Sequence, residues 1–284
     1  MTVHLASTAM HAPDLDALAD LVAGGGVVVL SGAGLSTESG IPDYRGPTGA
    51  ARPSSPMTYQ VFTGDPAARR RYWARSHLGW HVIGEARPNP GHVAVERLQT
   101  AGLLDGIVTQ NVDGLHQAAG ARDVVDLHGR LDAVLCMDCG ERSEREVLAA
   151  RLEHANRAWQ AQVLAVHPDG DVAVPDADLA SFVVVPCAAC GGVLKPDVVF
   201  FGENVPRDRV QHSFALVEQA RALVVLGTSL TVMSGYRFVL RAAKLGVPVA
   251  IVNQGTTRGD AQARLRLDAP LGPALTVLAG RLAA

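Results

Sequence analysis

Four cysteines in two matched pairs constrain the fold of this chain more than any other feature of its sequence. They occur as Cys136-Met-Asp-Cys139 and Cys187-Ala-Ala-Cys190, and each pair is followed by glycine. This spacing lets both thiolates of a pair reach one tetrahedral zinc ion at about 2.3 Å, and the glycines permit the tight turn. The sequence predicts one structural zinc site. Because cysteine fills all four positions, this metal stabilises the fold and has no open position for catalysis.

Disulfides and metal-free buried thiols are the alternatives for these cysteines. Residues 1–22 lack a basic segment and a long apolar core, so we expect no secretory signal. This segment is also acidic and free of arginine, unlike an organelle transit peptide, which predicts a cytoplasmic protein. Reducing conditions there disfavour disulfides, and two matched pairs disfavour metal-free thiols.

The segment between the cysteine pairs is long for a zinc ribbon. Ser143-Glu-Arg-Glu146 has the form of a capping box, and residues 147–166 place apolar side chains at helical spacing. A turn at His167–Gly170 and a strand over Phe182–Val185 then return the chain to Cys187. The pattern predicts a small zinc-ribbon module that carries a helical insertion.

Short apolar runs alternate with amphipathic segments in the rest of the chain, which is typical of a parallel α/β sheet. The predicted strands are Val27–Leu30, Gly106–Thr109, Val124–Leu127, Ala222–Leu226 and Pro248–Val252. The predicted helices are Leu15–Ala23, Pro90–Ala101, Arg207–Ala220 and Gly235–Leu245. We therefore expect a Rossmann-like, doubly wound parallel sheet, with a smaller zinc-ribbon and helical domain inserted in it.

The expected division of the chain follows from this pattern. Residues 1–45, 100–130 and 196–284 form the Rossmann-like domain, residues 46–99 a lid and helical module, and residues 131–195 the zinc-ribbon module.

Three predicted strands end in polar, glycine-bearing turns: Ser31–Gly34, Gly227–Ser229 and Asn253–Gly255. Ligands of doubly wound sheets bind at the carboxyl ends of the strands, so these turns predict one extended ligand with phosphates. The first turn does not match the dehydrogenase pattern G-x-G-x-x-G, because the next glycine after Gly34 is Gly40. This mismatch disfavours a hydride-transferring dehydrogenase.

Several longer stretches occur in the order found in sirtuins, the NAD-dependent protein lysine deacylases. They are GAGLSTESGIPDYRG at 32–46, TQNVDGLH at 109–116, LHG at 127–129, GTSL at 227–230 and VNQG at 252–255, together with KPDVVFFGE at 195–203 and the cysteine pairs. The resemblance runs from Leu15 to the C-terminus. The wording TESGIPDYR resembles the branch that includes mitochondrial sirtuins with weak deacetylase activity, and Tyr44 stands where many sirtuins have phenylalanine.

This resemblance implies NAD as co-substrate and one structural zinc ion held by Cys136, Cys139, Cys187 and Cys190. It implies that the glycine turn approaches the pyrophosphate, that Asp113 holds the nicotinamide carboxamide, and that Tyr44 and Arg45 lie on a lid over the nicotinamide ribose. The NAD-binding residues that it implies are Gly32, Ala33, Gly34, Ser36, Thr37, Asp43, Tyr44, Arg45, Gln110, Asn111, Asp113, His128, Gly227, Thr228, Ser229, Asn253, Gln254, Gly255 and Leu271.

His128 and Asn111 are the catalytic residues that the resemblance implies. In the family's reaction the acyl-lysine oxygen attacks C1′ of NAD, nicotinamide leaves, and a base then takes a proton from the ribose. An imidazole with a pKa near 6.5 suits this base at neutral pH. His128 ends an apolar strand and precedes a glycine. His116 is the nearest rival, and we expect it to pack or hydrogen-bond inside the next helix.

Acyl-lysine side chains of proteins are the implied substrates. A peptide strand could add along Val198–Glu203. Tyr72 and Arg75 have the Y-x-x-R spacing that binds acidic acyl groups in some sirtuins, so the acyl preference stays open. With 25 basic and 28 acidic residues, the net charge of −3 predicts neither a nucleic-acid nor a membrane partner, and no apolar run approaches the ~20 residues of a membrane span.

Two other functions remain as alternatives. One is transfer of ADP-ribose to a protein, which would use the same NAD cleft. The other is a non-catalytic zinc-ribbon binding module for nucleic acid, which the acidic balance disfavours. The sequence predicts no oligomeric state.

Overall fold

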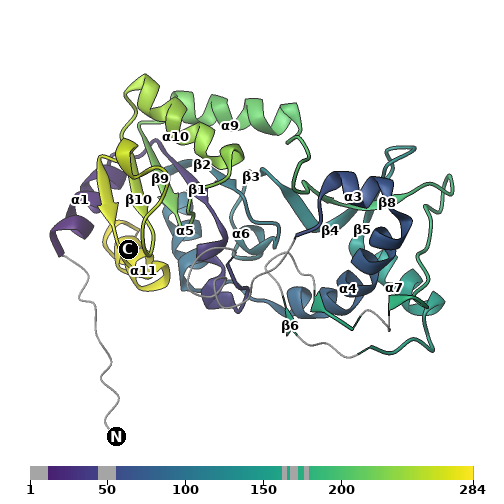
Figure 1. Cartoon of the computed structure of the whole chain (residues 1–284). Helices are drawn as coiled ribbons and strands as arrows, with labels where there is room; N and C mark the ends of the chain where they lie inside the picture. Colours follow the sequence, from purple (N-terminus) through teal and green to yellow (C-terminus); the bar gives the residue numbers. More distant parts are fainter. Residues whose placement is uncertain (1–11, 44–55, 162–164, 167–171, 176–178, 284) are drawn as a thin grey trace, which may run out of the picture.

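A six-stranded parallel sheet forms the larger part of the molecule (Figure 1). The structure is a computed structural model that describes residues 12–43, 56–161, 165–166, 172–175 and 179–283. The strand order is β11-β10-β9-β1-β2-β3, and all neighbours run parallel. The strands are β1 Val27–Ser31, β2 Leu104–Thr109, β3 Val124–Asp126, β9 Ala222–Leu226, β10 Val249–Val252 and β11 Leu265–Leu267.

The order of the strands creates a crevice beside β1. The chain runs outward from β1 through β2 to β3, and later returns on the other side of β1 with β9, β10 and β11. The carboxyl ends of β1 and β9 therefore flank the point where the winding direction changes, which is where ligands bind in such sheets. The predicted Rossmann-like sheet is confirmed, although the short edge strand β11 was not predicted.

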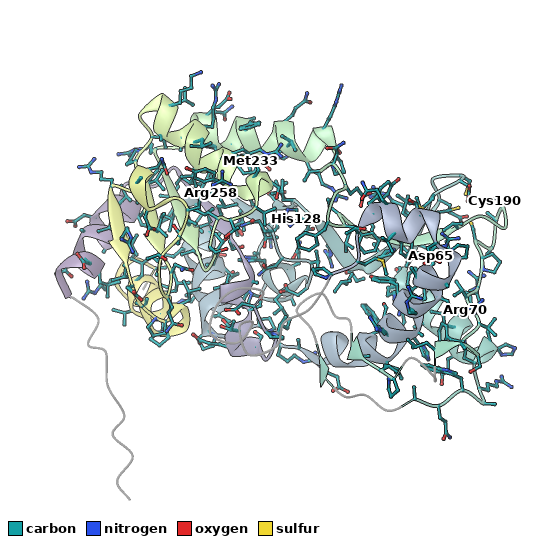
Figure 2. The ribbon with its side chains drawn as sticks, viewed as in Figure 1. Asp65, Arg70, His128, Cys190, Met233 and Arg258 are labelled. Carbon is teal, nitrogen blue, oxygen red and sulfur yellow. The ribbon has the colours of Figure 1, made fainter. Side chains whose placement is uncertain are left out.

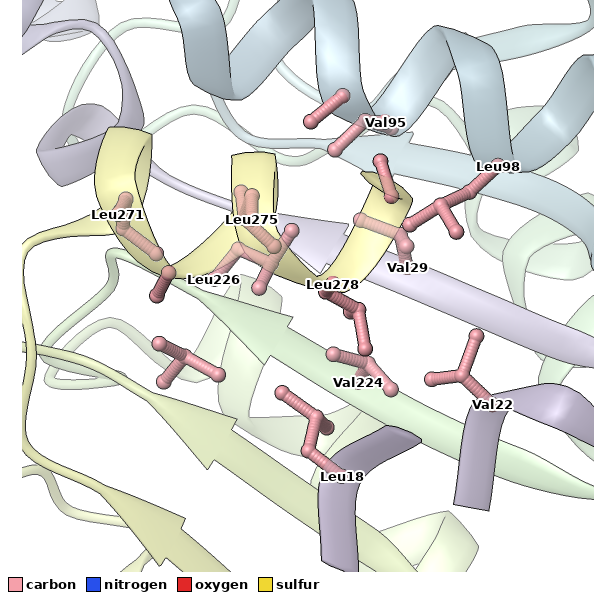
Figure 3. Packing of buried hydrophobic residues seen from close by; sticks show 14 of the residues in the cluster. Leu18, Val22, Val29, Val95, Leu98, Val224, Leu226, Leu271, Leu275 and Leu278 are labelled. Atoms are coloured by element: carbon pink, nitrogen blue, oxygen red, sulfur yellow. The ribbon is translucent and has the colours of Figure 1, made fainter. Parts of the chain in front are cut away.

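Helices cover both faces of this sheet. One face packs against α1 Ala12–Ala23, α5 Pro90–Thr100 and α11 Leu271–Leu282, and buries Leu18, Leu98, Val224 and Leu278 (Figure 3). The other face packs against α9 Arg207–Gln219 and α10 Met233–Leu245. Because both faces of each central strand are buried, these strands are mostly apolar; β1 and β9 are fully buried, and Ser31 is the one polar residue of these two strands.

A smaller lobe is built on the antiparallel sheet β5-β4-β8. Its elements are α3 Tyr59–Gly64, α4 Pro66–Glu85, β4 Gly129–Cys136, β5 Arg142–Glu144, α7 Arg145–Ala155, β6 Ala165–Val166, β7 Val172–Ala173 and β8 Leu194–Val198. One apolar core joins Phe62 and Trp73 of the helical part to Leu152 and Phe182 of the zinc-ribbon part. The two predicted modules thus share a core, whereas α5 packs on the large sheet; the domain boundaries themselves stay a prediction.

Two details of the zinc-ribbon module were predicted wrongly. The capping box does not form, because Ser143 pairs with Val134 inside β5 and Glu144 precedes α7 without a side-chain cap. The predicted strand Phe182–Val185 is irregular. The Asn156 amide takes the place of a partner strand: its Nδ2 lies 2.9 Å from the carbonyl of Val183, and its Oδ1 lies 2.7 Å from the Val183 amide.

The insertion helix is also shorter than predicted. It ends at Ala155, and the amide of Asn156 donates to the carbonyl of Leu152, four residues back. The predicted turn His167–Gly170 lies outside the described residues. Within the described part of the chain, no helix is long and apolar enough to cross a membrane.

Candidate active site

A cavity of about 600 Å³ lies between the carboxyl ends of β1, β2 and β9 and the segment that follows β8. Its volume lies within the range of small-molecule sites. It is lined by these predicted residues: Gly32, Ala33, Gly34, Ser36, Thr37, Asp43, Gln110, Asn111, Asp113, His128, Gly227, Thr228, Ser229, Asn253, Gln254 and Leu271. Gly255 is not part of the lining. Tyr44 and Arg45 lie outside the described residues, so the predicted lid stays a prediction.

The glycines after β1 let two turns pack against each other. The amides of Gly32 and Gly34 donate to the carbonyls of Leu226 and Gly227, at 2.9 and 2.8 Å. A Cβ at position 34 would lie 2.9 Å from the Cα of Gly227, and one at position 32 would lie 2.5 Å from the Cβ of Thr228. The turn after β1 is therefore held directly on the turn after β9.

No α-helix follows this turn. The chain makes two short 3₁₀ turns, η1 Ala33–Leu35 and η2 Thr37–Ser39. Gly40 then ends η2 with φ = 85°, a left-handed conformation that glycine adopts without strain. The 3₁₀ path keeps both Ser36 and Thr37 at the cavity wall.

A chain of hydrogen bonds joins Asn111, Ser36 and Asp113 at the cavity. The amide nitrogen Nδ2 of Asn111 donates to the Ser36 hydroxyl at 3.0 Å and to the carbonyl of Gly32 at 3.0 Å. The Ser36 hydroxyl donates to Oδ2 of Asp113 at 2.7 Å, while Oδ1 accepts from the amide of Leu115 at 3.0 Å. These bonds fix the amide and carboxylate groups that were predicted to order the nicotinamide pocket.

His128 lies where the sheet meets the smaller lobe, between Met233 and the zinc-ribbon side of the molecule (Figure 2). Its Nδ1 is 2.9 Å from the carbonyl oxygen of Gln110, and its Nε2 is 2.8 Å from the Ser234 hydroxyl. Burial is the main cause that lowers the pKa of His128; the Gln110 carbonyl opposes this effect, and Arg237 and Arg209 add to it. The ring is therefore neutral at physiological pH.

His116 occupies a different environment. It lies in α6 Leu115–Ala118, is fully buried, and its Nε2 is 2.9 Å from the Ser31 hydroxyl. Its ring packs edge-on against His92 with 5.2 Å between the centroids. Burial and the neighbouring His92 lower the pKa of His116 to about 3. This placement confirms the expected packing and hydrogen-bonding role.

The four cysteines form a compact group at the far end of the smaller lobe. All four sulfurs lie within 4.8 Å of one another, with 3.5 Å between Cys136 and Cys190 and 3.9 Å between Cys139 and Cys187. Sulfurs around a tetrahedral zinc ion are about 3.8 Å apart, as Zn–S bonds of about 2.3 Å require. The four thiols are unpaired and fit one zinc ion, in agreement with the sequence-based prediction.

The two residues of the Y-x-x-R motif differ in their position relative to the cavity. Tyr72 is buried and lines the cavity beside Ile41, Leu131 and Phe200, whereas Arg75 is not part of the lining. Among the described lining residues, Arg237 is the sole arginine or lysine. The part of the cavity wall that the structure describes therefore has no Tyr72–Arg75 pair to bind an acidic acyl group.

Several lining residues escaped the sequence analysis, among them Ser234, Arg237 and Glu38. Ser234 and Arg237 belong to α10, whose first residues follow the recognised GTSL stretch, but no motif marked them. Glu38 lies in η2, and its Oε1 accepts from the amide of Gly272 at 2.9 Å, near the start of α11. Ser234 and Arg237 reach the cavity only through the fold, whereas Glu38 lies within the motif at 32–46, directly after Thr37.

Comparison with known proteins identifies relatives over nearly the whole chain. The model of the Sir2 family matches residues 32–234, more than half of the sequence. The NAD-dependent protein deacetylase 1 of Streptomyces coelicolor is 60% identical over 269 residues, covering 95% of this chain and 90% of that protein. The NAD-dependent protein deacetylase 1 of Mycobacterium avium is 50% identical over 270 residues, covering 93% and 94%.

Solved structures agree with this relationship. A Sir2 bound to acetylated peptide is 27% identical, has a TM-score of 0.75, and covers 94% of this chain and 98% of its own. A Sir2 in complex with a p53 peptide and NAD⁺ is 30% identical with a TM-score of 0.72, covering 94% and 96%. The family match, the high identity to these relatives and the shared fold show that the chain belongs to the Sir2 family.

Proposed function

We propose that this protein is an NAD-dependent protein lysine deacylase in which His128 is the general base. The observation that carries the residue assignment is the pair of contacts at His128. A carbonyl oxygen only accepts hydrogen bonds, so the contact with Gln110 requires the proton on Nδ1. The lone pair of the neutral ring is then on Nε2, at the cavity.

Residues for the co-substrate surround the same cavity. NAD supplies the ribose carbon to which the acyl oxygen is transferred. We assign the diphosphate to the turns at Gly32–Gly34 and Thr228–Ser229, and the nicotinamide end to Asn111 and Asp113. Support comes from their shared cavity and from the hydrogen bonds that fix Asn111 and Asp113 before any ligand binds.

The peptide substrate has a matching surface on the segment after β8. Glu203 holds this segment: its Oε2 accepts from the amide of Phe200 at 2.9 Å and from the Lys195 ammonium at 3.1 Å. Val198 to Val205 line the cavity, so a peptide that adds along Val198–Glu203 would bring its lysine toward His128. Solved relatives hold acetylated and propionylated peptides.

For the acyl group, we propose acetyl and other short uncharged chains. Ile41, Tyr72, Leu131 and Phe200 give the described wall an apolar surface. A carboxylate buried there without a cation would cost several kcal/mol, or would have to be protonated. Arg237 belongs to α10, on the side of the cavity where His128 and Ser234 lie.

One peptide series tests this function. Peptides of one sequence carrying acetyl, propionyl, butyryl or succinyl lysine are incubated with the protein and NAD, and the products are separated by mass spectrometry. We expect free lysine peptide and O-acyl-ADP-ribose from the uncharged groups, and little product from succinyl lysine. ADP-ribose attached to a protein, without any deacylated peptide, would instead establish ADP-ribosyl transfer. Efficient removal of succinyl groups would contradict the assigned acyl class alone.

A further inference from the structure

The base atom of His128 already has a partner in the protein. Ser234 is the second residue of α10, and its hydroxyl lies 2.8 Å from Nε2. Because Nδ1 carries the ring proton, Nε2 can only accept, and the Ser234 hydroxyl donates to it. A ribose hydroxyl that gives its proton to His128 must therefore either displace Ser234 or act through it.

Ser234 lies on a firmly packed element. A Cβ at position 235 would lie 2.4 Å from Oε1 of Gln110, so Gly235 allows the first turn of α10 to contact the residue that also orients His128. Directly behind this turn, Tyr236 and Phe238 are buried, and the Tyr236 hydroxyl donates to Gln262 at 3.1 Å. Rotating the Ser234 hydroxyl away would break its 2.8 Å contact with Nε2, whereas a relay through the hydroxyl keeps that contact.

We propose that Ser234 is a further catalytic residue, which carries the proton between the ribose hydroxyl and His128. The ribose O–H bond breaks, and its proton goes to the Ser234 oxygen while the original Ser234 proton goes to Nε2. The electron pair stays on the ribose oxygen and forms its new bond to the acyl carbon, while the π electrons of the bond between that carbon and the lysine nitrogen move onto the nitrogen. The proposal rests on the assignment of His128 as the base.

The relay also leaves both nitrogens of the His128 ring hydrogen-bonded after proton transfer. The new imidazolium donates from Nδ1 to the Gln110 carbonyl and from Nε2 to the Ser234 oxygen, because a hydroxyl can donate to neutral histidine and accept from charged histidine. Hydrogen bonds to a charged group are the stronger kind. They matter here because Arg237 and Arg209 disfavour a positive charge on the His128 ring.

Ser234→Ala tests the relay against a purely structural role. We expect single-turnover deacylation to slow by a factor on the order of ten to a hundred, below the loss from removing the base itself. NAD affinity and nicotinamide exchange, which precede base action, stay within about twofold. Ser234→Thr, which keeps the hydroxyl, restores most of the rate. The control is Ser213→Ala, which removes a buried serine hydroxyl that donates to its own helix at Arg209 and does not line the cavity.

Two measurements make the outcome decisive. In mixtures of H₂O and D₂O, the wild-type deacylation rate should depend on deuterium content along a curve, as two moving protons require, and Ser234→Ala should give a straight line. Nitrogen NMR of His128 in the free enzyme should show that Nε2 changes environment in Ser234→Ala while Nδ1 keeps its proton.

Two results would overturn the relay: a wild-type deacylation rate in Ser234→Ala, or equal losses of exchange and deacylation, which would mean that Ser234 organises the NAD site. A wild-type rate in His128→Ala would remove the assigned base itself, and so distinguishes that failure from a failure of the relay.

Discussion

The carbonyl oxygen of Gln110 lies 2.9 Å from Nδ1 of His128, and this contact selects the nitrogen of His128 that can act as a base. Gln110 comes directly after β2, and its own side chain donates to the Thr228 hydroxyl at 3.1 Å. The residue that sets the tautomer of the base is thus tied to the turn that we assign to phosphate binding.

The lowered pKa of His128 predicts that the acidic limb of the pH profile of kcat/KM lies below pH 6.5.

His128→Ala should remove deacylation without unfolding the protein. His128 is half-buried at the cavity, and the assigned NAD contacts lie on other residues. We expect deacylation to fall by a factor on the order of 10² or more, the usual loss for a positioned base. Nicotinamide exchange should persist in part, because expulsion of nicotinamide needs no proton removed by this ring. Product analysis by mass spectrometry and an exchange assay separate the two steps.

His212→Ala serves as the control for this experiment. This histidine is exposed on α9 and is not part of the cavity lining, so its removal should leave both rates unchanged. A wild-type deacylation rate in His128→Ala would exclude it as the base.

Loss of one zinc ligand should unfold at least the smaller lobe. Cys136 and Cys187 are buried and belong to the core that also contains Trp73 and Phe182. Structural zinc sites contribute folding energy directly. Cys136→Ser should therefore reduce bound zinc from one ion per chain to nearly none and abolish much of the near-UV circular dichroism signal.

Ala188→Ser is a matched control, since it places the same residue at an exposed position inside the second cysteine pair. This variant should keep its bound zinc and its native near-UV circular dichroism spectrum. If a chelator removes the metal while the spectrum and activity stay native, zinc does not hold this lobe together.

The sheet could be predicted from the sequence because its central strands are buried on both faces. Such strands appear as uninterrupted apolar runs, and the runs at Val27 and Ala222 coincide with β1 and β9. The turns after these strands contain glycine where a side chain would collide, as at Gly34. Burial and steric limits thus leave a record in the local sequence.

Other features depend on contacts between distant segments, so they cannot be recognised in the local sequence. Residues 182–185 have the composition of a strand, yet the Asn156 side chain takes the hydrogen bonds of Val183. The capping box predicted at Ser143 does not form, because Ser143 pairs with β4 as part of β5. Ser234 reaches His128 across a sequence separation of 106 residues, and a single sequence gives no sign of that contact.

Ser36→Ala should weaken NAD binding through the residues that Ser36 joins. Its hydroxyl accepts from Asn111 and donates to Asp113, so the substitution leaves Oδ2 of Asp113 without its donor. We expect a stability loss of about 1 kcal/mol, the low end for an unpaired acceptor because Asp113 is only partly buried. The KM for NAD should rise about tenfold, which equals about 1.4 kcal/mol of binding energy.

Ser39→Ala provides the comparison. This serine lies in the neighbouring 3₁₀ turn, accepts from Asn89 at 3.0 Å and is not part of the cavity lining. A similar change of KM in both variants would show that the effect is a general loosening of this segment.

The buried pair His92 and His116 should make the protein sensitive to mild acid. Burial lowers the pKa of His92 to about 4, although Asp113 partly opposes this, and burial together with His92 lowers the pKa of His116 to about 3. In the unfolded chain both groups have a pKa near 6.5. Above pH 6.5 neither state is protonated at these rings. As the pH falls below 6.5, the unfolded state binds protons that the folded state does not, so the free energy of unfolding decreases.

Between pH 7 and pH 5 this decrease should be about 2 kcal/mol for each histidine, because one pKa unit corresponds to 1.36 kcal/mol. Urea unfolding at several pH values measures it. In His92→Asn/His116→Gln the dependence should largely disappear, since asparagine can replace the Nδ1 acceptor for Asn89 and glutamine can replace the Nε2 contact with Ser31. The exposed variant His212→Gln should keep the wild-type dependence. Should the double variant fail to fold, NMR titration of the wild type gives the same answer: either buried ring protonating near pH 6.5 in the folded protein would contradict the prediction.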